Sequence, residues 1–184
     1  MPTSSAKDRA YTVIPYQESW RDNFETIKNQ LLPVFSSRAI EIIHVGSAAI
    51  VGMSGKPTID VLVIINDIAR IDDLNATMTE LGYVALGEYV APNSRLFAKE
   101  ENNERLVNIH CFERSHPHAQ EMIVMRDFLQ SHPEEAEAYA DLKIDLYRRY
   151  PDDYKEYRHF KDPYLTKMKA RAIEWAESSI KPDK

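Results

Sequence analysis

The stretch IIHVGSAAIVGMSGKPTIDVLVII, residues 42–65, places a glycine-rich loop between two apolar runs. The runs at 39–45 (AIEIIHV) and 58–66 (TIDVLVIIN) are rich in β-branched residues, which favour strands. The second run is apolar almost throughout, as a strand covered on both faces would be. We therefore expect a central strand at 58–66 that carries a single carboxylate, Asp60.

The rest of the chain changes from strand patterns to helix patterns at about residue 116. Apolar residues at helical spacing predict a helix over 16–35 that ends near Pro33, because proline removes a backbone donor. Turn and cap residues separate the other expected elements, which are a helix at 71–82, strands at 83–90, 95–100 and 105–113, and helices at 121–132, 133–150 and 153–179. This order predicts an α/β (α+β) fold, in which a mixed β-sheet flanked by helices precedes a C-terminal helical layer.

Composition limits the classes of protein that this chain can represent. With 184 residues, 43% of them hydrophobic, we expect 1–184 to form a single compact unit. A net charge of -6 argues against nucleic acid as a partner held by bulk electrostatics. The longest apolar run, VLVII, is too short to span a membrane, and the single Cys111 excludes an intrachain disulfide framework. We therefore expect a cytoplasmic protein with no membrane partner.

Asp60 needs a partner because a buried, unpaired carboxylate costs several kcal/mol. The strand expected at 105–113 carries Asn108 and His110 on one face, so either side chain could lie opposite Asp60. The pair could fix the register of the sheet. Alternatively, Asp60 could belong to a catalytic or metal site.

The loop before Asp60 has the composition of an anion site. Gly46 and Ser47 directly follow a strand, so they offer backbone N–H groups and a hydroxyl group to a phosphate. Lys56 adds a cation near the end of the loop, although GMSGKP is not a Walker sequence. The alternative is a tight connection in which glycine and proline only turn the chain.

The segment HVGSAAIVGMSGKPTIDVLV resembles the signature of the GrpB family, which combines a histidine, a Gly-Ser turn, a Lys-Pro pair and a strand aspartate. The segments RLFAKE, RLVNIHCFE, MRDFLQSHPEEAEAYADLK and YKEYRHFKDPYL are similar to further segments of that family. The resemblance covers about residues 12–177. It implies a nucleotidyltransferase-like core at 12–115 and a C-terminal helical layer at 116–180.

The resemblance also implies a chemistry. In the nucleotidyltransferase superfamily a Gly-Ser turn holds the triphosphate, and several carboxylates hold two metal ions that align the reacting groups. By position, Gly46 and Ser47 would form the phosphate turn, and Asp60 would be the first metal carboxylate. The second carboxylate of the usual pair would stand at position 62, which is Leu62. This departure leaves a catalytically degenerate binding protein as an alternative.

His44 and His110 both match positions of the family pattern. A divalent metal at Asp60 would be Mg²⁺ or Mn²⁺. If both histidines ligate together with Asp60, they could make a three-ligand site for Zn²⁺. His110 could instead act as a general base in a different reaction. The alternative for each histidine is a core position with a satisfied ring.

Basic residues form the last candidate group. Lys56, Arg95, Lys99 and Arg105 could bind a polyphosphate, and Arg95 and Lys99 share a strand face. In the helical layer the residues Tyr139, Lys143, Tyr157 and Lys161 also match the family, and they could close over the site or form solvated helix faces.

Two functions follow from these residues. The first is metal-dependent transfer of a nucleoside monophosphate from a nucleoside triphosphate to an acceptor that the sequence does not name. The second is binding of a nucleotide, a coenzyme or another phosphorylated small molecule without turnover. Leu62 favours the second function, whereas the Gly-Ser turn is common to both.

Overall fold

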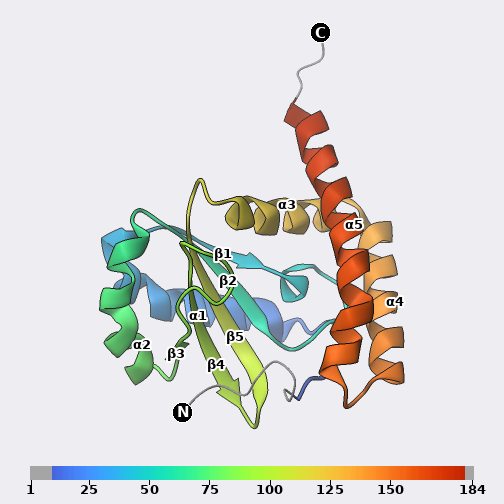
Figure 1. The fold of residues 1–184 in the computed structure, drawn as a ribbon, viewed down its shortest axis with the longest axis horizontal. Coiled ribbons are helices and arrows are strands. Elements are labelled where there is room, and N and C mark those ends of the chain that lie inside the picture. The colour runs from blue at the N-terminus through green and yellow to red at the C-terminus, as the bar shows by residue number, and fades with distance from the viewer. Residues whose placement is uncertain (1–9, 181–184) are drawn as a thin grey trace.

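The computed structural model describes residues 10–180. In this part of the chain the strands form one sheet of 5 strands in the order β1-β2-β5-β4-β3 (Figure 1). The strands are β1 (Ala39–Val45), β2 (Ile59–Ile65), β3 (Val84–Ala85), β4 (Arg95–Glu101) and β5 (Glu104–Glu113). β2 is parallel to β5 and antiparallel to β1, and β5 is antiparallel to β4. The sheet is therefore mixed, as predicted.

The described α-helices lie on both faces of the sheet. They are α1 (Ser19–Phe35), α2 (Asn75–Glu80), α3 (Pro117–Ser131), α4 (Pro133–Arg149) and α5 (Tyr154–Ile180). α3 lies across one face of the sheet, where it contacts β1, β2 and β5, and α4 and α5 lie side by side beyond it (Figure 1). The expected α/β fold, with flanking helices and a C-terminal helical layer, is confirmed.

Strand pairing sorts the alternating residues of each strand between the two faces. On the α1 face the largest apolar cluster joins residues of β2 and β5 to apolar residues of α1 and α2, including Val61, Ile109, Phe24 and Met78. On the opposite face Leu62, Ile64 and Phe112 pack against Ala119 of α3. The strand expected at 58–66 is thus covered on both faces.

Several predicted boundaries are wrong. The helix expected at 71–82 is an α-helix only over Asn75–Glu80, after a 3₁₀ turn at Asp72–Leu74, and the helix expected at 121–132 begins at Pro117. The expected strand at 83–90 is limited to Val84–Ala85, because the segment beyond it turns back into β4 through Asn93, which has a φ of 57°. The helix expected to end near Pro33 continues to Phe35, so that Pro33 lies inside its last turn. The helix then ends at Ser36, which has a φ of 47° and donates its N–H to the carbonyl of Leu32.

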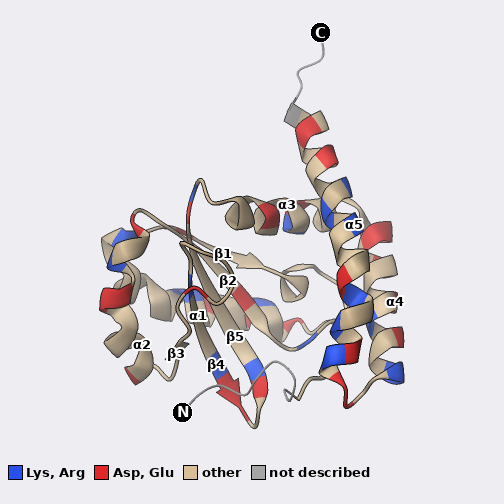
Figure 2. Ribbon diagram, in the orientation of Figure 1, with Lys and Arg blue, Asp and Glu red and all other residues tan. Residues whose placement is uncertain are grey.

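Charged residues are concentrated away from the centre of the sheet. Figure 2 shows acidic and basic residues interspersed along α4 and α5, and on β4 and β5 it shows them mainly toward the ends that meet at the β4–β5 turn. Within residues 10–180 there is no helix long and apolar enough to cross a membrane.

Candidate functional site

Two adjoining cavities lie between the sheet and the C-terminal helices. The smaller one, of about 170 Å³, is here called the lysine cavity because Lys56, Lys143 and Lys161 line it. The larger one, of about 350 Å³, is called the methionine cavity because Met122 and Met125 line it. Ser47, Asp60 and Tyr139 line both. The two cavities together form one cleft.

The loop after β1 approaches Asp60 and Lys143 closely. Gly46 has a φ of 74°, and a Cβ atom placed on it would lie 2.6 Å from Asp60 Oδ2. A Cβ atom on Gly55 would lie 2.9 Å from Ser47 Cβ and 3.4 Å from Lys143 Nζ. Such distances exclude a larger residue without movement of the neighbours. The glycines are therefore needed for the backbone to pass beside these polar side chains.

Asp60 lies opposite Asn108 in the parallel pair β2–β5. Its Oδ1 atom accepts a hydrogen bond of 2.8 Å from Asn108 Nδ2 and lies 3.3 Å from His110 Nε2. The expected proximity of Asn108 and His110 to Asp60 is confirmed. Burial raises the pKa of Asp60, but the bonds from His110 and Asn108 and the charge of Lys56 outweigh it and hold the pKa below its usual value. The site thus keeps Asp60 ionised.

Lys143 is the most deeply buried cation of the cleft, with 3% of its surface exposed. Its Nζ atom donates a 2.8 Å hydrogen bond to Ser47 Oγ and lies 4.6 Å from the centre of the Tyr139 ring. Burial, and then the charges of Lys161 and Lys56, lower the pKa of Lys143 to about 7. The cleft therefore favours the neutral form of this amine more than water does.

The other two lysines of the lysine cavity come from different elements. Lys56, at the end of the loop, donates a 2.8 Å hydrogen bond to the hydroxyl group of Tyr154. Lys161, on α5, pairs with Asp162 at 2.6 Å. The residues of the helical layer named in the sequence analysis, Tyr139, Lys143, Tyr157 and Lys161, all line this cavity.

Arg105 acts on the cleft through Asn108. It is 5% exposed, and it donates hydrogen bonds of 2.8 Å to Asn108 Oδ1 and to Glu100 Oε1. Since the Asn108 amide also donates to Asp60, Arg105 fixes the orientation of that amide.

The structure places Arg95 and Lys99 on the other face of the sheet. Arg95 makes a bidentate pair with Asp72, at 2.6 and 2.7 Å, and Lys99 lies 5.6 Å from the centre of the Tyr83 ring. Their alternation along β4 was expected. The register of β4 with β5 turns this face toward α2 and away from Asp60.

His44 is also separated from Asp60 and His110. Its ring stacks on Phe24 of α1 at 4.6 Å, and its Nε2 atom is buried without a partner among the described residues. Burial lowers the pKa of His44 to about 4. The three side chains that were considered as metal ligands therefore do not meet.

The donor set does not fit a pair of divalent ions. Position 62 is a leucine that is fully buried in an apolar cluster, so Asp60 has no neighbouring acid on its strand face. Within residues 10–180 no group of 3 or more His, Cys, Asp or Glu side chains is arranged to hold a metal. Hard divalent ions require several oxygen ligands, which Asp60 and the Asn108 amide do not supply.

The methionine cavity has a different lining. Ile50, Met122, Met125, Leu129 and Leu165 supply apolar surface, while His110 and Arg126 supply polar groups. At its margin Lys169 of α5 pairs with Glu121 of α3 at 3.0 Å. Methionine side chains adapt to ligands of irregular shape, so this cavity suits an apolar or aromatic group.

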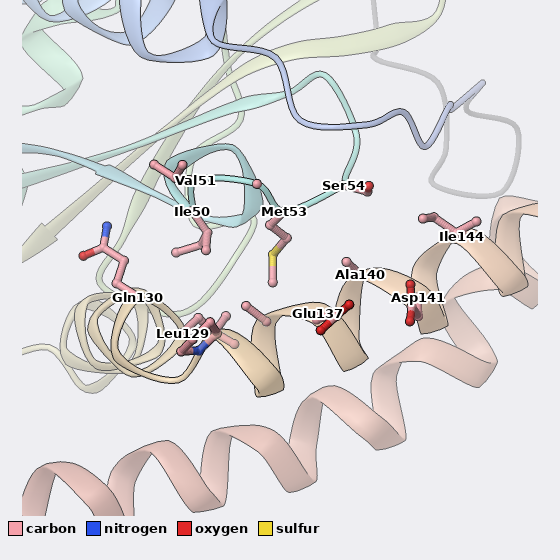
Figure 3. Close-up of a pocket in the computed structure, with 13 residues that line it drawn as sticks. Ile50, Val51, Met53, Ser54, Leu129, Gln130, Glu137, Ala140, Asp141 and Ile144 are labelled. Carbon is pink, nitrogen blue, oxygen red and sulfur yellow. The ribbon is translucent and has the colours of Figure 1, made fainter.

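A further cavity, of about 530 Å³, lies between the loop and α4 (Figure 3). Glu137 and Asp141 point into it from α4, and Met53 projects from the loop. Its lining residues include no Lys, Arg or His. Although it is larger than the two cavities of the cleft, its charge does not suit a phosphate group.

Sequence reasoning did not identify Tyr154, Met122, Met125 or Leu165 as lining residues. They lie on helices more than 50 residues after Asp60, and tyrosine, methionine and leucine are ordinary packing residues in a helix. Only the folded chain brings them to the cleft.

Two curated proteins are similar to this chain over most of its length. UPF0157 protein YqkA of Bacillus subtilis is 32% identical over 167 residues, which are 91% of this chain and 48% of YqkA. Dephospho-CoA kinase of Mycobacterium tuberculosis is 26% identical over 191 residues, which cover 90% of this chain and 47% of the kinase. The chain thus spans about half the length of each of these relatives.

A solved structure and a family model agree with each other. The crystal structure of conserved protein GrpB from Enterococcus faecalis matches with a TM-score of 0.84 and 25% identity, and the match covers 90% of this chain and 99% of that chain. The family model described as GrpB protein matches residues 10–171, which include the sheet, the cleft and most of α5. The chain therefore belongs to the GrpB family.

Proposed function

We propose that the cleft binds a nucleotide or another phosphorylated small molecule. The observation that carries this proposal is the convergence of Lys56, Lys143 and Lys161 with the Ser47 hydroxyl in the lysine cavity. The hydrogen bonds of Lys56 and Lys143 go to hydroxyl groups rather than to carboxylates, so an anion does not have to displace a carboxylate from either lysine. Phosphate oxygens can accept bonds from all of these groups.

The two cavities suit chemically different parts of such a ligand. The phosphate groups occupy the lysine cavity, and the organic part extends past Ser47 and Tyr139 into the methionine cavity. The combined volume is within the range of about 300–1,000 Å³ that small-molecule sites occupy. The name of the mycobacterial relative, a kinase acting on a coenzyme precursor, makes coenzyme A and ATP suitable first ligands.

Binding without transfer is the function that this geometry supports best. Metal-dependent transfer of a nucleoside monophosphate would need more oxygen ligands than the cleft provides. The backbone N–H groups and the hydroxyl group of the Gly-Ser turn, in contrast, can bind a phosphate group without a metal ion. Asp60 repels a phosphate placed directly beside it, which favours the end of the cavity near Lys143 and Lys161.

Calorimetric titration of wild type with pyrophosphate, ATP and coenzyme A tests the proposal. We expect Lys161→Met to weaken binding by about tenfold, or ~1.4 kcal/mol, because it removes a cation from the lysine cavity. The matched control is Lys155→Met, which changes an exposed lysine of the same helix and leaves affinity unchanged. Absence of binding by folded wild type, or an equal loss in both variants, contradicts the proposal.

A second variant tests whether the organic part of the ligand binds in the methionine cavity. Met125→Gln places an amide in the methionine cavity, so we expect it to weaken ATP or coenzyme A while pyrophosphate binds as before. A turnover assay with Mg²⁺ or Mn²⁺ decides between binding and transfer. Release of pyrophosphate from a nucleoside triphosphate that is lost in Asp60→Asn would replace our proposal by nucleotidyl transfer.

A further inference from the structure

Lys143 differs from the other cations of the lysine cavity in its burial. It is 3% exposed, whereas Lys56 and Lys161 are half-buried, and its hydrogen bond, like that of Lys56, goes to a neutral hydroxyl group, that of Ser47. A buried ammonium group is expensive without an anionic partner, so this environment favours the neutral amine. A neutral amine has a free electron pair and is a nucleophile.

The charges around Lys143 favour conversion of the amine into an anion. The titratable and charged groups that line the same cavity are Lys56, Asp60, Tyr139, Tyr154, Tyr157 and Lys161. Lys56 and Lys161 are cations from two different elements, and they oppose a proton on Lys143 by repulsion. The same two cations would stabilise a negative charge at the end of its side chain. Asp60 is the carboxylate of this set, and it is already bonded to Asn108.

We propose that Lys143 is a site of reversible carbamylation by carbon dioxide. The electron pair of Nζ attacks the carbon of CO₂, an N–C bond forms, and one C–O π bond opens to place the negative charge on oxygen. The nitrogen releases one proton to solvent, so that the amine and CO₂ give a carbamate and a proton. No oxidant or other reactant is needed.

The cavity can accommodate the product. A carbamate adds three heavy atoms to Nζ, and the lysine cavity has a volume of about 170 Å³. Its oxygens lie in the cavity with the ammonium groups of Lys56 and Lys161 and the hydroxyl groups of the tyrosines. The modification gives a negative charge to the side chain that bonds Ser47, so it changes which anions the cavity accepts. Carbamylation does not depend on phosphate binding, and each can fail without the other.

Carbon-13 NMR of the protein in ¹³C-bicarbonate tests this inference. At a fixed partial pressure of CO₂, wild type is expected to show a carbamate resonance that grows as the pH rises through about 7, where the amine loses its proton. Lys143→Arg keeps a basic side chain that does not form a carbamate, and it should abolish the resonance. Lys155→Met, which changes an exposed lysine, should retain it.

Chemical trapping locates the modification. A trialkyloxonium salt esterifies the carbamate, and the mass increase is expected on the peptide that contains Lys143. Lys161→Met keeps Lys143 but removes a neighbouring cation, so it should lower the trapped fraction. A resonance that persists in Lys143→Arg, or a trapped ester confined to surface lysines, overturns the assignment. Absence of both signals from folded wild type overturns it as well.

Discussion

The two faces of the sheet place a strand histidine in different environments. His44 faces α1, stacks on Phe24 and has its ring buried, so its pKa is lowered to about 4. His110 faces the cleft and lies 3.3 Å from Asp60, with Asn108 beside it. The residue type is the same, but the packing differs. A histidine in a strand therefore becomes a core residue or a site residue according to the helix that covers it.

The helices explain this difference. On one face α1 contributes Trp20, Phe24, Leu31 and Phe35 to a continuous apolar cluster with the sheet. On the other face α3 packs against Leu62 and its apolar neighbours, whereas the end of the sheet at Asp60 borders the two cavities. The polar residues therefore lie on the part of this face that α3 does not cover.

Neighbouring residues of β5 should differ strongly in their contribution to stability. Ile109 is fully buried on the α1 face, so Ile109→Ala is expected to cost about 2–5 kcal/mol of unfolding free energy. His110→Ala removes one interaction at the margin of a cavity and should cost about 1 kcal/mol. Urea denaturation of both variants measures the difference. A cost for His110→Ala as large as that of Ile109→Ala would place His110 in the structural core.

Alanine variants of two loop glycines distinguish the cost of backbone strain from the cost of side-chain overlap. Gly46 and Gly52 have φ values of 74° and 79°, and either alanine variant is expected to lose about 1–2 kcal/mol from the left-handed conformation. At Gly46 the new Cβ atom also meets Asp60 at 2.6 Å, whereas nothing lies within 4 Å of it at Gly52. Gly46→Ala should therefore be the less stable variant in urea and should also lose ligand binding. Equal stability of the two variants would contradict the close approach to Asp60.

Removal of the buried amine should stabilise the protein. The pKa of Lys143 is about 7 in the folded chain and 10.5 in its ordinary state, so the unfolded chain binds the additional proton between these values. Wild-type stability should consequently rise with pH across this window. The fall of the pKa from 10.5 to about 7 corresponds to an upper bound of about 5 kcal/mol, at about 1.4 kcal/mol per unit, and loss of the bond to Ser47 reduces the gain. Lys143→Met is therefore expected to raise the unfolding free energy by about 2–4 kcal/mol near pH 7 and by less as the pH approaches 10.

Thermal denaturation at several pH values checks this dependence. Lys155→Met, at an exposed position, should not change the slope. A Lys143→Met variant that is less stable than wild type near pH 7 would show that the bond to Ser47 outweighs the burial of the amine.

The smallest expected effect is on the stability of the protein at acid pH, through the His44 ring on the α1 face. Because the pKa of His44 falls from 6.5 to about 4 on folding, the unfolded chain takes up a proton in this range and the folded chain does not. The unfolding free energy of wild type should fall by about 1 kcal/mol as the pH falls from 6.5 to 4. This value is reduced because the His44 ring is partly exposed to solvent. His44→Phe keeps a ring against Phe24 and should flatten this slope, whereas His159→Phe, at an exposed position, should leave it unchanged. An unaltered slope in His44→Phe would refute the burial of a neutral ring.

Much of the fold was predictable because it depends on local patterns. β-branched runs predicted β1 and β2, and helical spacing with prolines predicted α3, α4 and α5. The proximity of Asp60 to Asn108 and His110 was also predictable, since an ionised carboxylate in an apolar strand requires polar partners. The segment at 83–90 was not, because its apolar residues belong to a turn whose shape depends on pairing with β4.

The candidate site was only partly predictable. Alternation along β4 correctly placed Arg95 and Lys99 on one face, but only the register with β5 shows that this face is directed away from Asp60. The same reason separates His44 from His110. Lys143 and Lys161 matched a sequence pattern, yet nothing local to α4 or α5 distinguishes a lysine that faces a cavity from one that faces solvent.

Residue type and spacing along the chain were enough to predict the elements, the family resemblance and a half-buried carboxylate on an apolar strand beside a Gly-Ser turn. These features are local, since they depend on residue type, spacing and the need of a charge for a partner. The tertiary structure decided which strand faces meet and which lysines converge on Ser47. Those outcomes depend on strand register and on helix packing between segments about 100 residues apart. Alternation within a strand cannot fix them, because it gives the relative orientation of its own side chains and not the face that a distant helix will cover.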